Sequence, residues 1–421
     1  MKQTLTFFFV ILLFLFPRLY AQDFWETLPF PDTAHVKSIA VNNQGHIFIG
    51  AGSNNTIGGV YRSIDGGLNW EFVLNMDDFG VLSLEINNQG TIYAGTNHAF
   101  HPLYASYDNG VTWKELPIPT NLNVIKIKSR GADTLYVSLW VGNGPLVLKS
   151  EDGGLNWDTI FYDQPPTFTV QYVKDIAITK SGIIYLCLQG YFPDSGGVYK
   201  SEDDGATWEL SGLFNHMLSS LAINSQNDLF AGAWGGVPGL HVLRNGEEEW
   251  TKLLDGPNIT DVAISSIDHI YLGSHGPNGV IRSLDNGLTF EMITDGLVLG
   301  IINGLTIDIN SYIYAFNTKL SRSINPLVSV FEPDSEKTSL ISKLFPNPVH
   351  DFLFVEFPEA FFQHENIPVI IYDIAGNSWL SASIDTAQKT YNFDLSHFAS
   401  GIYIAEFQLQ HRNHRQLFIK Y

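Results

Sequence analysis

Short segments in which apolar and polar residues alternate fill most of the chain, and they recur in a fixed order. From Val36 onward one unit reads VKSIAV, NNQG, HIFIGAG, a loop, GGVYRS, IDGGLN and WEFVL. Alternation with a period of two is typical of half-buried β-strands, and clusters of Asn, Asp and Gly mark the turns between them. Each unit therefore predicts four short strands in about 40 residues, the size of one propeller blade.

The first strand of this unit is found seven times along the chain. These strands begin near Val36, Val81, Val124, Val173, Leu218, Thr260 and Ile302. Seven copies of a four-stranded unit predict an all-β fold, with a seven-bladed β-propeller over residues 22–325.

One octapeptide within the unit, at the turn between its third and fourth strands, repeats most clearly. The copies are SIDGGLNW (63–70), SYDNGVTW (106–113), SEDGGLNW (150–157), SEDDGATW (201–208) and SLDNGLTF (283–290). Their aspartates are Asp65, Asp108, Asp152, Asp203 and Asp285, separated by 43, 44, 51 and 82 residues. The 82-residue interval contains a degenerate copy, in which Asn245 stands at the aspartate position and Trp250 at the tryptophan position. Because a carboxylate accepts N–H bonds across its own turn, we interpret these aspartates as structural turn residues.

The seventh unit ends near Ser323 without a fourth strand of its own. The segment FWETLPF (24–30) has the pattern of the fourth strands elsewhere, such as NWEFVL and TWKELP. We expect this N-terminal strand to complete the last blade and close the ring, since an open array would leave an exposed sheet edge.

The repeat stops after Ser323. Residues 326–339 are mostly polar, contain two prolines and are predicted to be a linker. Residues 340–421 contain further alternating segments with Asn-Pro, Ala-Gly and Ser-Gly turns. This pattern predicts a small immunoglobulin-like β-sandwich.

The first 21 residues have the features of a secretory signal peptide. Lys2 precedes an apolar run from Phe7 to Phe16, and Ala21 is a small residue at the expected cleavage point. No later run approaches the ~20 apolar residues of a membrane-spanning helix, so no transmembrane segment is expected.

Composition narrows the possible partners. Lys and Arg number 23 and Asp and Glu number 43, a formal net charge of −20, which argues against binding to nucleic acid or to an anionic membrane.

Cys187 is the only cysteine, which excludes an intramolecular disulfide and a Cys-rich zinc module, and its apolar neighbours predict a buried packing residue. The sequence has no P-loop, no G-x-S-x-G and no H-E-x-x-H, so we expect no cofactor.

The two faces of the predicted propeller differ in composition. The hairpin face carries the short polar turns between first and second strands, together with the octapeptides. The loop face carries the longer loops between second and third strands and between blades, and such loops are where binding usually resides. Candidate ligand-binding residues on the loop face are Trp140, Tyr191, Trp234, His98 and His275. Candidate catalytic carboxylates on the loop face are Asp77, Asp78, Asp163 and Asp194.

These side chains allow more than one interpretation. Aromatic rings beside amides and carboxylates suit a sugar, whose C–H face stacks on a ring while its hydroxyl groups form hydrogen bonds. The alternative is that the aromatic residues fold down as caps over the blades. Two carboxylates about 5 to 9.5 Å apart would suit a glycoside hydrolase, but the sequence does not give this separation. His98 and His101 have no third ligand nearby in sequence, so no metal site is expected.

The octapeptides resemble the Asp-box, or BNR repeat, S-x-D-x-G-x-T-W, of sialidases, some xyloglucanases, sortilin-type receptors and photosystem-assembly-factor-like propellers. The resemblance covers six of the seven units, counting the decayed copy, and implies the propeller fold rather than one activity. Sialidases hold the substrate carboxylate with three arginines, one of them in an Arg-Ile-Pro segment, which is absent here. The arginines of the propeller lie at hairpin-face positions: Arg62, Arg130, Arg244, Arg282 and Arg322. Sialidase activity is therefore disfavoured.

The C-terminal segments are similar to the C-terminal sorting domain of type IX secretion substrates in Bacteroidota. They are LFPNPVHDFLFVEF (344–357), VIIYDIAGNSW (369–379), FDLSHFASGIYIAEF (393–407) and LFIKY (417–421). The landmarks of the family occur in order: Pro346, Asn347, Pro348, Tyr372, Asp373, Gly376, Leu395, Gly401, Tyr403 and Lys420. The resemblance implies export through the periplasm to the cell surface or the medium, with the type IX secretion machinery as a partner.

Together these features predict a secreted or cell-surface propeller that is a non-catalytic binding module for a glycan or another extracellular partner. One alternative is a glycoside hydrolase acting on a neutral glycan. Another is a structural propeller that interacts only with proteins.

Overall fold

The computed structural model describes residues 23–31, 35–52, 57–141, 144–162, 171–190, 195–327, 343–345, 351–356, 366–373, 378–385, 390–399, 401–408 and 413–420. The chain divides into two compact units between Asn325 and Pro326. The predicted signal peptide (1–21) and most of the predicted linker (326–339) lie outside the described residues. None of the described residues forms a helix with the length and apolar character needed to cross a membrane.

The described residues before Pro326 form seven four-stranded antiparallel sheets, which confirms the predicted seven-bladed propeller. The first strands of the blades are β2 (Val36–Val41), β6 (Val81–Ile86), β10 (Asn123–Arg130), β14 (Gln171–Ile178), β18 (Leu218–Ile223), β22 (Ile259–Ile264) and β26 (Gly304–Ile307). The second strands are β3 (Ile47–Ala51), β7 (Ile92–Thr96), β11 (Thr134–Val141), β15 (Ile184–Gly190), β19 (Leu229–Ala233), β23 (Ile270–Ser274) and β27 (Ile313–Phe316). Neighbouring first strands contact each other all around the ring, including β26 with β2, and they line a central channel.

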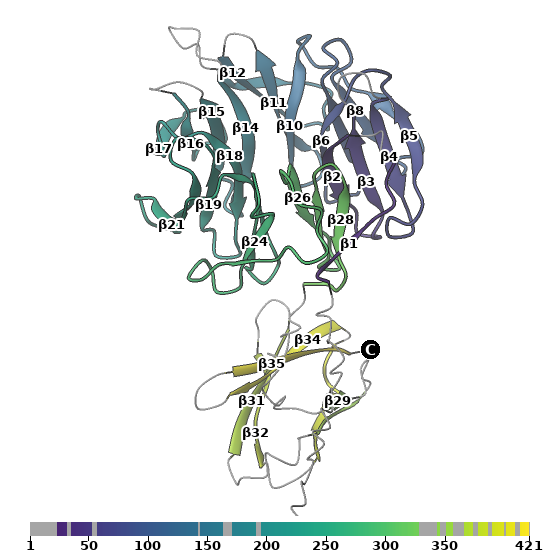
Figure 1. Ribbon diagram of the computed structural model, residues 1–421, viewed down its shortest axis with the longest axis vertical. Helices are drawn as coiled ribbons and strands as arrows, with labels where there is room; N and C mark the ends of the chain where they lie inside the picture. Colours follow the sequence, from purple (N-terminus) through teal and green to yellow (C-terminus); the bar gives the residue numbers. More distant parts are fainter. Residues whose placement is uncertain are drawn as a thin grey trace, which may run out of the picture. The chain divides into compact units, whose positions relative to one another are not determined.

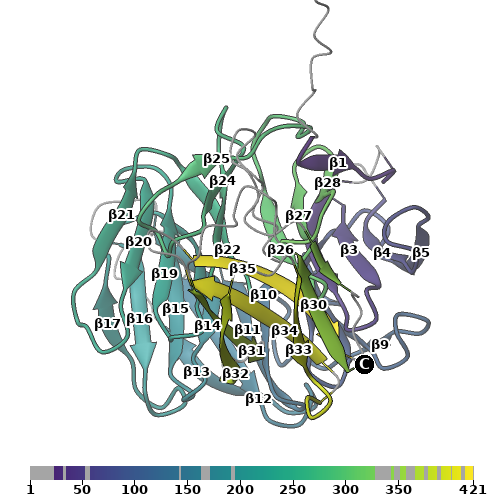
Figure 2. The same ribbon diagram turned by 90° about the horizontal axis from the view of Figure 1, so that it is seen from below.

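The outer half of each blade consists of the third and fourth strands. The third strands are β4 (Gly59–Ser63), β8 (Leu103–Ser106), β12 (Gly144–Ser150), β16 (Gly197–Ser201), β20 (Gly239–Leu243), β24 (Val280–Ser283) and β28 (Leu320–Ser323). The fourth strands are β5 (Glu71–Asn75), β9 (Lys114–Glu115), β13 (Asp158–Tyr162), β17 (Glu209–Gly212), β21 (Thr251–Asp255), β25 (Glu291–Met292) and, for the last blade, β1 (Trp25–Thr27). Figure 1 shows the blades in sequence colours, and in Figure 2 strands β10, β14 and β22 lie toward the middle of the ring and β5, β17 and β21 toward its outside.

The last blade combines strands from the two ends of the propeller. Strand β1 pairs antiparallel with β28, with Trp25 opposite Ser323 and Glu26 opposite Arg322. The Trp25 side chain is 2% exposed, and its Nε1 donates a hydrogen bond to the Ile293 carbonyl at 2.7 Å. Strand β28 therefore has a paired neighbour on each side, and the sheet of the last blade contains four strands like the others.

The second strands do not alternate between buried and exposed residues, because each is covered by a neighbouring blade on both faces. Every residue of β3 is buried, and a Cβ atom at Gly50 would lie 2.7 Å from the Val81 carbonyl oxygen of the next blade. Ser138 and Cys187 occupy the equivalent register positions in β11 and β15. Cys187 is fully buried, and burial raises the pKa of its thiol well above the usual value. The cysteine therefore takes the place of a small residue at a blade-to-blade contact.

The octapeptides form hairpins between third and fourth strands. In the first copy Ser63 Oγ donates to Asp65 Oδ1 at 2.8 Å, and Asp65 Oδ1 accepts the Asn69 backbone N–H at 2.9 Å. Hydrogen bonds from the Asn69 side chain and backbone lower the pKa of Asp65 to about 2. The same serine-to-aspartate bond occurs at Asp108, Asp152, Asp203 and Asp285. The hydrogen-bonding capacity of these carboxylates is used within their own turns.

Residues after Asn325 form the second unit, whose described residues make two sheets. One contains β29 (Lys343–Phe345), β30 (Phe352–Glu356) and β33 (Thr390–Asp394). The other contains β32 (Ser378–Asp385), β31 (Asn366–Asp373), β34 (Gly401–Gln408) and β35 (Asn413–Lys420) in that order. Side chains from both sheets, including Leu353, Val369 and Phe407, share one buried core. The unit is a small β-sandwich.

Closure of the last blade by β1 gives a prediction about stability. Because Trp25 is buried and hydrogen-bonded, Trp25→Ala should lower the free energy of unfolding by about 3–5 kcal/mol. Trp140, which is 48% exposed, supplies the matched control, and Trp140→Ala should lower the free energy of unfolding much less. Urea unfolding followed by circular dichroism measures both. Equal losses in the two variants would show that β1 does not hold the ring together.

Candidate functional site

Six of the seven first strands share a β-bulge near their beginning, and β26 has none. Their pairing with the second strands skips one residue between Val36 and Ser38, between Val81 and Ser83, and at the equivalent places in β10, β14, β18 and β22. Two consecutive side chains of each strand therefore line the channel. The skipped residues and Asn303 form what we call the mouth ring: Lys37, Leu82, Ile125, Lys174, Ser219, Thr260 and Asn303. The residues that follow them form the inner ring: Ser38, Ser83, Lys126, Asp175, Ser220, Asp261 and Gly304.

Side chains of the inner ring connect the first six blades to the blade that follows each of them. The first strand is the edge of its sheet, so N–H groups on its free side need partners other than another strand. Ser83 Oγ accepts the Ile127 N–H at 3.0 Å, and Asp175 Oδ2 accepts the Leu221 N–H at 2.9 Å. The pattern continues where Ser220 Oγ accepts from Val262 at 3.3 Å and Asp261 Oδ2 accepts from Leu305 at 2.8 Å. Side chains of the preceding blade thus satisfy the strand edges.

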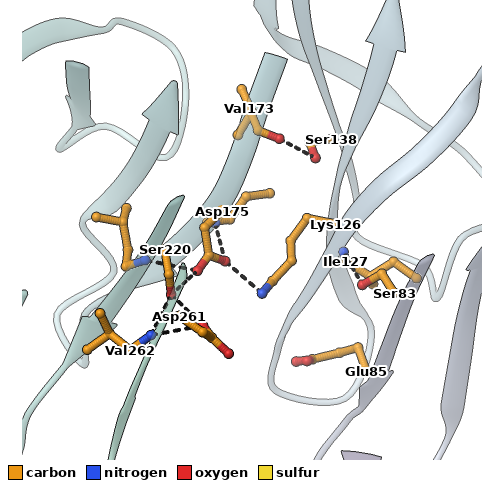
Figure 3. A network of polar contacts seen from close by, with 12 residues as sticks. Ser83, Glu85, Lys126, Ile127, Ser138, Val173, Asp175, Ser220, Asp261 and Val262 are labelled. Atoms are coloured by element: carbon orange, nitrogen blue, oxygen red, sulfur yellow. Dashed lines mark hydrogen bonds and ion pairs between the residues drawn. The ribbon is translucent and has the colours of Figure 1, made fainter. Parts of the chain in front are cut away.

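Asp175 is the centre of this network (Figure 3). Lys126 Nζ lies 2.8 Å from Asp175 Oδ1 on one side, and Ser220 Oγ lies 3.2 Å from Asp175 Oδ2 on the other. Ser220 Oγ also lies 2.8 Å from Asp261 Oδ1, so one hydroxyl group bridges two carboxyl groups. The network joins four consecutive blades through charged and polar side chains.

The two carboxyl groups have opposite pKa shifts. Burial opposes ionisation of Asp175, but the Lys126 ammonium and the hydrogen bonds from Lys126 and the Leu221 N–H together lower the Asp175 pKa. Burial raises the pKa of Asp261, because Lys126 and the hydrogen bonds to Asp261 do not fully compensate for it. Asp175 is therefore the ionised partner of Lys126, and Asp261 accepts a proton more readily than an ordinary aspartate.

A cavity of about 580 Å³ opens above the mouth ring on the loop face. Its lining residues are Val36, Lys37, Leu82, Asn97, Asn123, Ile125, Trp140, Tyr172, Lys174 and Asn303. They combine two aromatic rings, three side-chain amides and two ammonium groups, and none of these lining residues is an aspartate or glutamate. We call this space the mouth cavity. Its groups suit a ligand that has an apolar face, several hydrogen-bonding groups and negative charge.

Among the aromatic and histidine candidates from the sequence, Trp140 lines the mouth cavity. Trp234 and His275 lie in neighbouring blades, with stacked rings 6.2 Å apart, and neither is among the lining residues. The His98 ring packs 3.9 Å from the ring of Phe79, and its Nδ1 accepts the Phe100 N–H. Tyr191 lies outside the described residues.

Two of the four candidate carboxylates, Asp77 and Asp78, lie among the described residues. Asp77 has a positive φ of 52°, and its side chain bonds to Asn75 within a turn. Asp78 is exposed and does not line the mouth cavity. Asp163 and Asp194 lie outside the described residues. No group of three metal-ligating side chains occurs in the described part of the chain.

The arginines of the propeller are all engaged elsewhere. Each forms an ion pair, and the partners are Glu71 for Arg62, Asp204 for Arg130, Asp228 for Arg244, Glu291 for Arg282 and Glu26 for Arg322. None of them lines the mouth cavity. Positive charge at the cavity comes instead from Lys37 and Lys174, which lie in first strands and not in the loops of the loop face. The available signal was the second position of the repeated first strand, as in VKSIAV and VKDIAI.

Comparison with known proteins identifies the tail and supports the fold. Residues 343–420 match the family of secretion system C-terminal sorting domains, so the chain carries a type IX sorting tail, which indicates secretion to the cell surface or the extracellular space. No curated protein matches the chain in sequence.

Many solved structures are similar to this chain, and three of them are described here. YCF48 bound to a D1 peptide has 17% identity and a TM-score of 0.57, covering 72% of this chain and 98% of that chain. PorZ, a surface component of the type IX secretion system of Porphyromonas gingivalis, has 13% identity and a TM-score of 0.56, covering 92% and 59%. The GH74 enzyme of Niastella koreensis has 15% identity and a TM-score of 0.51, covering 69% and 52%. At these identities the similarity shows the fold alone.

The Lys126–Asp175 pair leads to a prediction about pH dependence. Asp175→Asn should lower the free energy of unfolding at pH 7 by about 2–3 kcal/mol, because it leaves the Lys126 ammonium without its counter-charge. A lowered pKa contributes stability above the unfolded-state value near 4, and this contribution is lost as the pH falls below it. The difference between wild type and variant should therefore shrink below about pH 4.

Thermal and urea unfolding between pH 7 and pH 3 measure this difference. Asp78→Asn, at an exposed carboxylate, is the control and should change stability little at any pH. A deficit for Asp175→Asn that stays constant across the whole pH range would contradict the ion-pair explanation.

The sorting tail yields a cellular prediction. A chain that lacks residues 343–420 should be synthesised but fail to reach the cell surface or the medium of the native host. Fractionation and immunoblotting of the full chain and the shortened chain measure the distribution. Surface exposure of the shortened chain equal to that of the full chain would show that another segment directs export.

Proposed function

We propose that the propeller is a secreted or cell-surface binding module that recognises a glycan at the mouth cavity without cleaving it. The observation that carries this proposal is the lining of the cavity. Trp140 and Tyr172 offer aromatic faces, and Asn97, Asn123 and Asn303 offer amide donors and acceptors. Sugar rings stack on aromatic side chains through their C–H faces while their hydroxyl groups bond to amides.

The channel carboxylates support binding over hydrolysis. A glycoside hydrolase needs one carboxyl group that donates a proton and a second that attacks the sugar or activates water. Asp175 and Asp261 already accept backbone N–H groups from neighbouring blades, and Asp175 is paired with Lys126. Proton transfer at these groups would disturb the contacts between blades. The similar folds of YCF48 with a bound peptide and of a GH74 enzyme illustrate that the scaffold alone does not choose between binding and catalysis.

Binding and cleavage are separated by one experiment with the purified chain. Glycan arrays record retention, and a reducing-end assay on the same glycans records release. Trp140→Ala should lower the affinity for a retained glycan at least tenfold, because the variant removes the exposed aromatic face of the cavity. Trp234→Ala is the matched control and should change affinity less than about twofold, since Trp234 does not line the cavity.

Two results would contradict the proposal. Release of reducing ends that is abolished by Asp163→Asn or Asp194→Asn would identify a hydrolase. Absence of both retention and release across the array would leave a protein partner as the better explanation for the loop face.

A further inference from the structure

Two lysines line the mouth cavity. Lys37 and Lys174 occupy equivalent bulge positions in β2 and β14 and both line the cavity. Neither forms an ion pair with a described residue, whereas Lys126, one step deeper in the channel, is paired with Asp175. The described lining of the cavity includes no carboxylate. Positive charge is therefore concentrated where the channel opens.

The surroundings of Lys174 favour an incoming anion. Its side chain is only partly exposed, and its Nζ lies 6.0 Å from the centre of the Tyr172 ring. Burial lowers the pKa of Lys174, and repulsion from Lys126 acts in the same direction. Both effects disfavour the charged ammonium, and the attraction of Asp175 and Asp261 only partly opposes them. A carboxylate placed beside Lys174 would offset them, because an opposite charge stabilises the ionised form.

The neighbouring side chains suggest which anion fits. Trp140 stands at the cavity with 48% of its surface exposed, available for the apolar face of a ring. The amides of Asn97, Asn123 and Asn303 provide both hydrogen-bond donors and acceptors, as a polyhydroxylated ring requires. A carboxylate, several hydroxyl groups and an apolar C–H face occur together in one molecule in a uronic acid.

We infer that the mouth cavity binds a uronic acid residue of an acidic saccharide, with its carboxylate held by Lys174 and Lys37 and its ring against Trp140. This inference rests on the proposed function and specifies the class of glycan. The acidic composition of the chain, with a formal net charge of −20, limits the ligand further. A long polyanion would be repelled by the rest of the surface, so the preferred ligand is short or carries few carboxylates.

The test uses pairs of saccharides that differ only in the carboxyl group. Short oligoglucuronates, oligogalacturonates and oligoguluronates, and the carboxyl-reduced neutral form of each, are titrated into the full chain by isothermal titration calorimetry. At least one acidic form should bind ten times more tightly than its reduced partner, because only the acidic form engages the two lysines.

Variants assign this preference to the cavity lysines. Lys174→Gln should remove most of the preference for the acidic form while leaving affinity for the reduced form within about twofold. Lys174→Arg keeps the charge and should retain a preference of at least threefold, which separates loss of charge from loss of folding. Lys128→Gln is the matched control, since Lys128 lines the opposite end of the channel. Thermal unfolding of each variant verifies the fold.

The possible failures can be told apart. If acidic and reduced forms bind equally and Lys174→Gln changes neither, the carboxylate subsite is wrong while the proposed glycan binding stands. If no saccharide of either form binds, both the inference of a uronic acid subsite and the proposed binding of a glycan are overturned. If only peptides with a free C-terminal carboxylate bind, and Lys174→Gln abolishes their binding, the cavity recognises a protein terminus and the glycan proposal fails with the inference.

Discussion

The propeller depends on satisfying the free edges of its seven first strands. Each of these strands has a sheet partner on one side only, and its other side faces the channel or the next blade. A second strand cannot be added there without filling the channel. Hydroxyl and carboxyl groups of the preceding blade accept the edge N–H groups instead, as Asp175 does for Leu221 and Asp261 does for Leu305. Polar residues therefore recur at the inner-ring position in six of the seven first strands.

This constraint separates structure from function along the channel. The bulge turns two consecutive residues toward the axis, and only the second of them forms the inner ring that connects blades. Two mouth-ring residues, Ser219 and Thr260, also donate to carbonyl groups of the next blade, whereas Lys37 and Lys174 form no ion pair with a described residue of another blade. The last blade shows how strict the packing is. In the last blade Gly304 has the inner-ring position, and the residue opposite it in the second strand is Phe316. Because the large Phe316 ring fills this space, a Cβ atom at Gly304 would lie only 2.4 Å from it.

The seven-bladed fold was predictable because its signals are local. Strand alternation, turn residues and an octapeptide that repeats with nearly constant spacing are all visible within about 40 residues. The mouth cavity was not predictable in the same way. Whether Lys174 or Asp175 faces the next blade depends on a bulge, and the bulge is defined by pairing with β15 rather than by the strand's own residues. Trp140 was accessible to sequence reasoning because it stands near the end of a recognisable second strand, β11, just before a loop, whereas Tyr172 and Lys174 lie within a first strand.

The contacts of the channel carboxylates also explain why the channel suits ligand recognition better than proton transfer. A catalytic acid or base has to change its protonation and its hydrogen bonds during turnover. Asp175 cannot do so without releasing Lys126 and the Leu221 N–H, and these contacts join three blades. The ammonium groups at the mouth have no comparable role in closing the ring, and they can gain a partner without losing one. Charge that is available for a ligand therefore lies above the inner ring, and charge that holds the ring together lies within it.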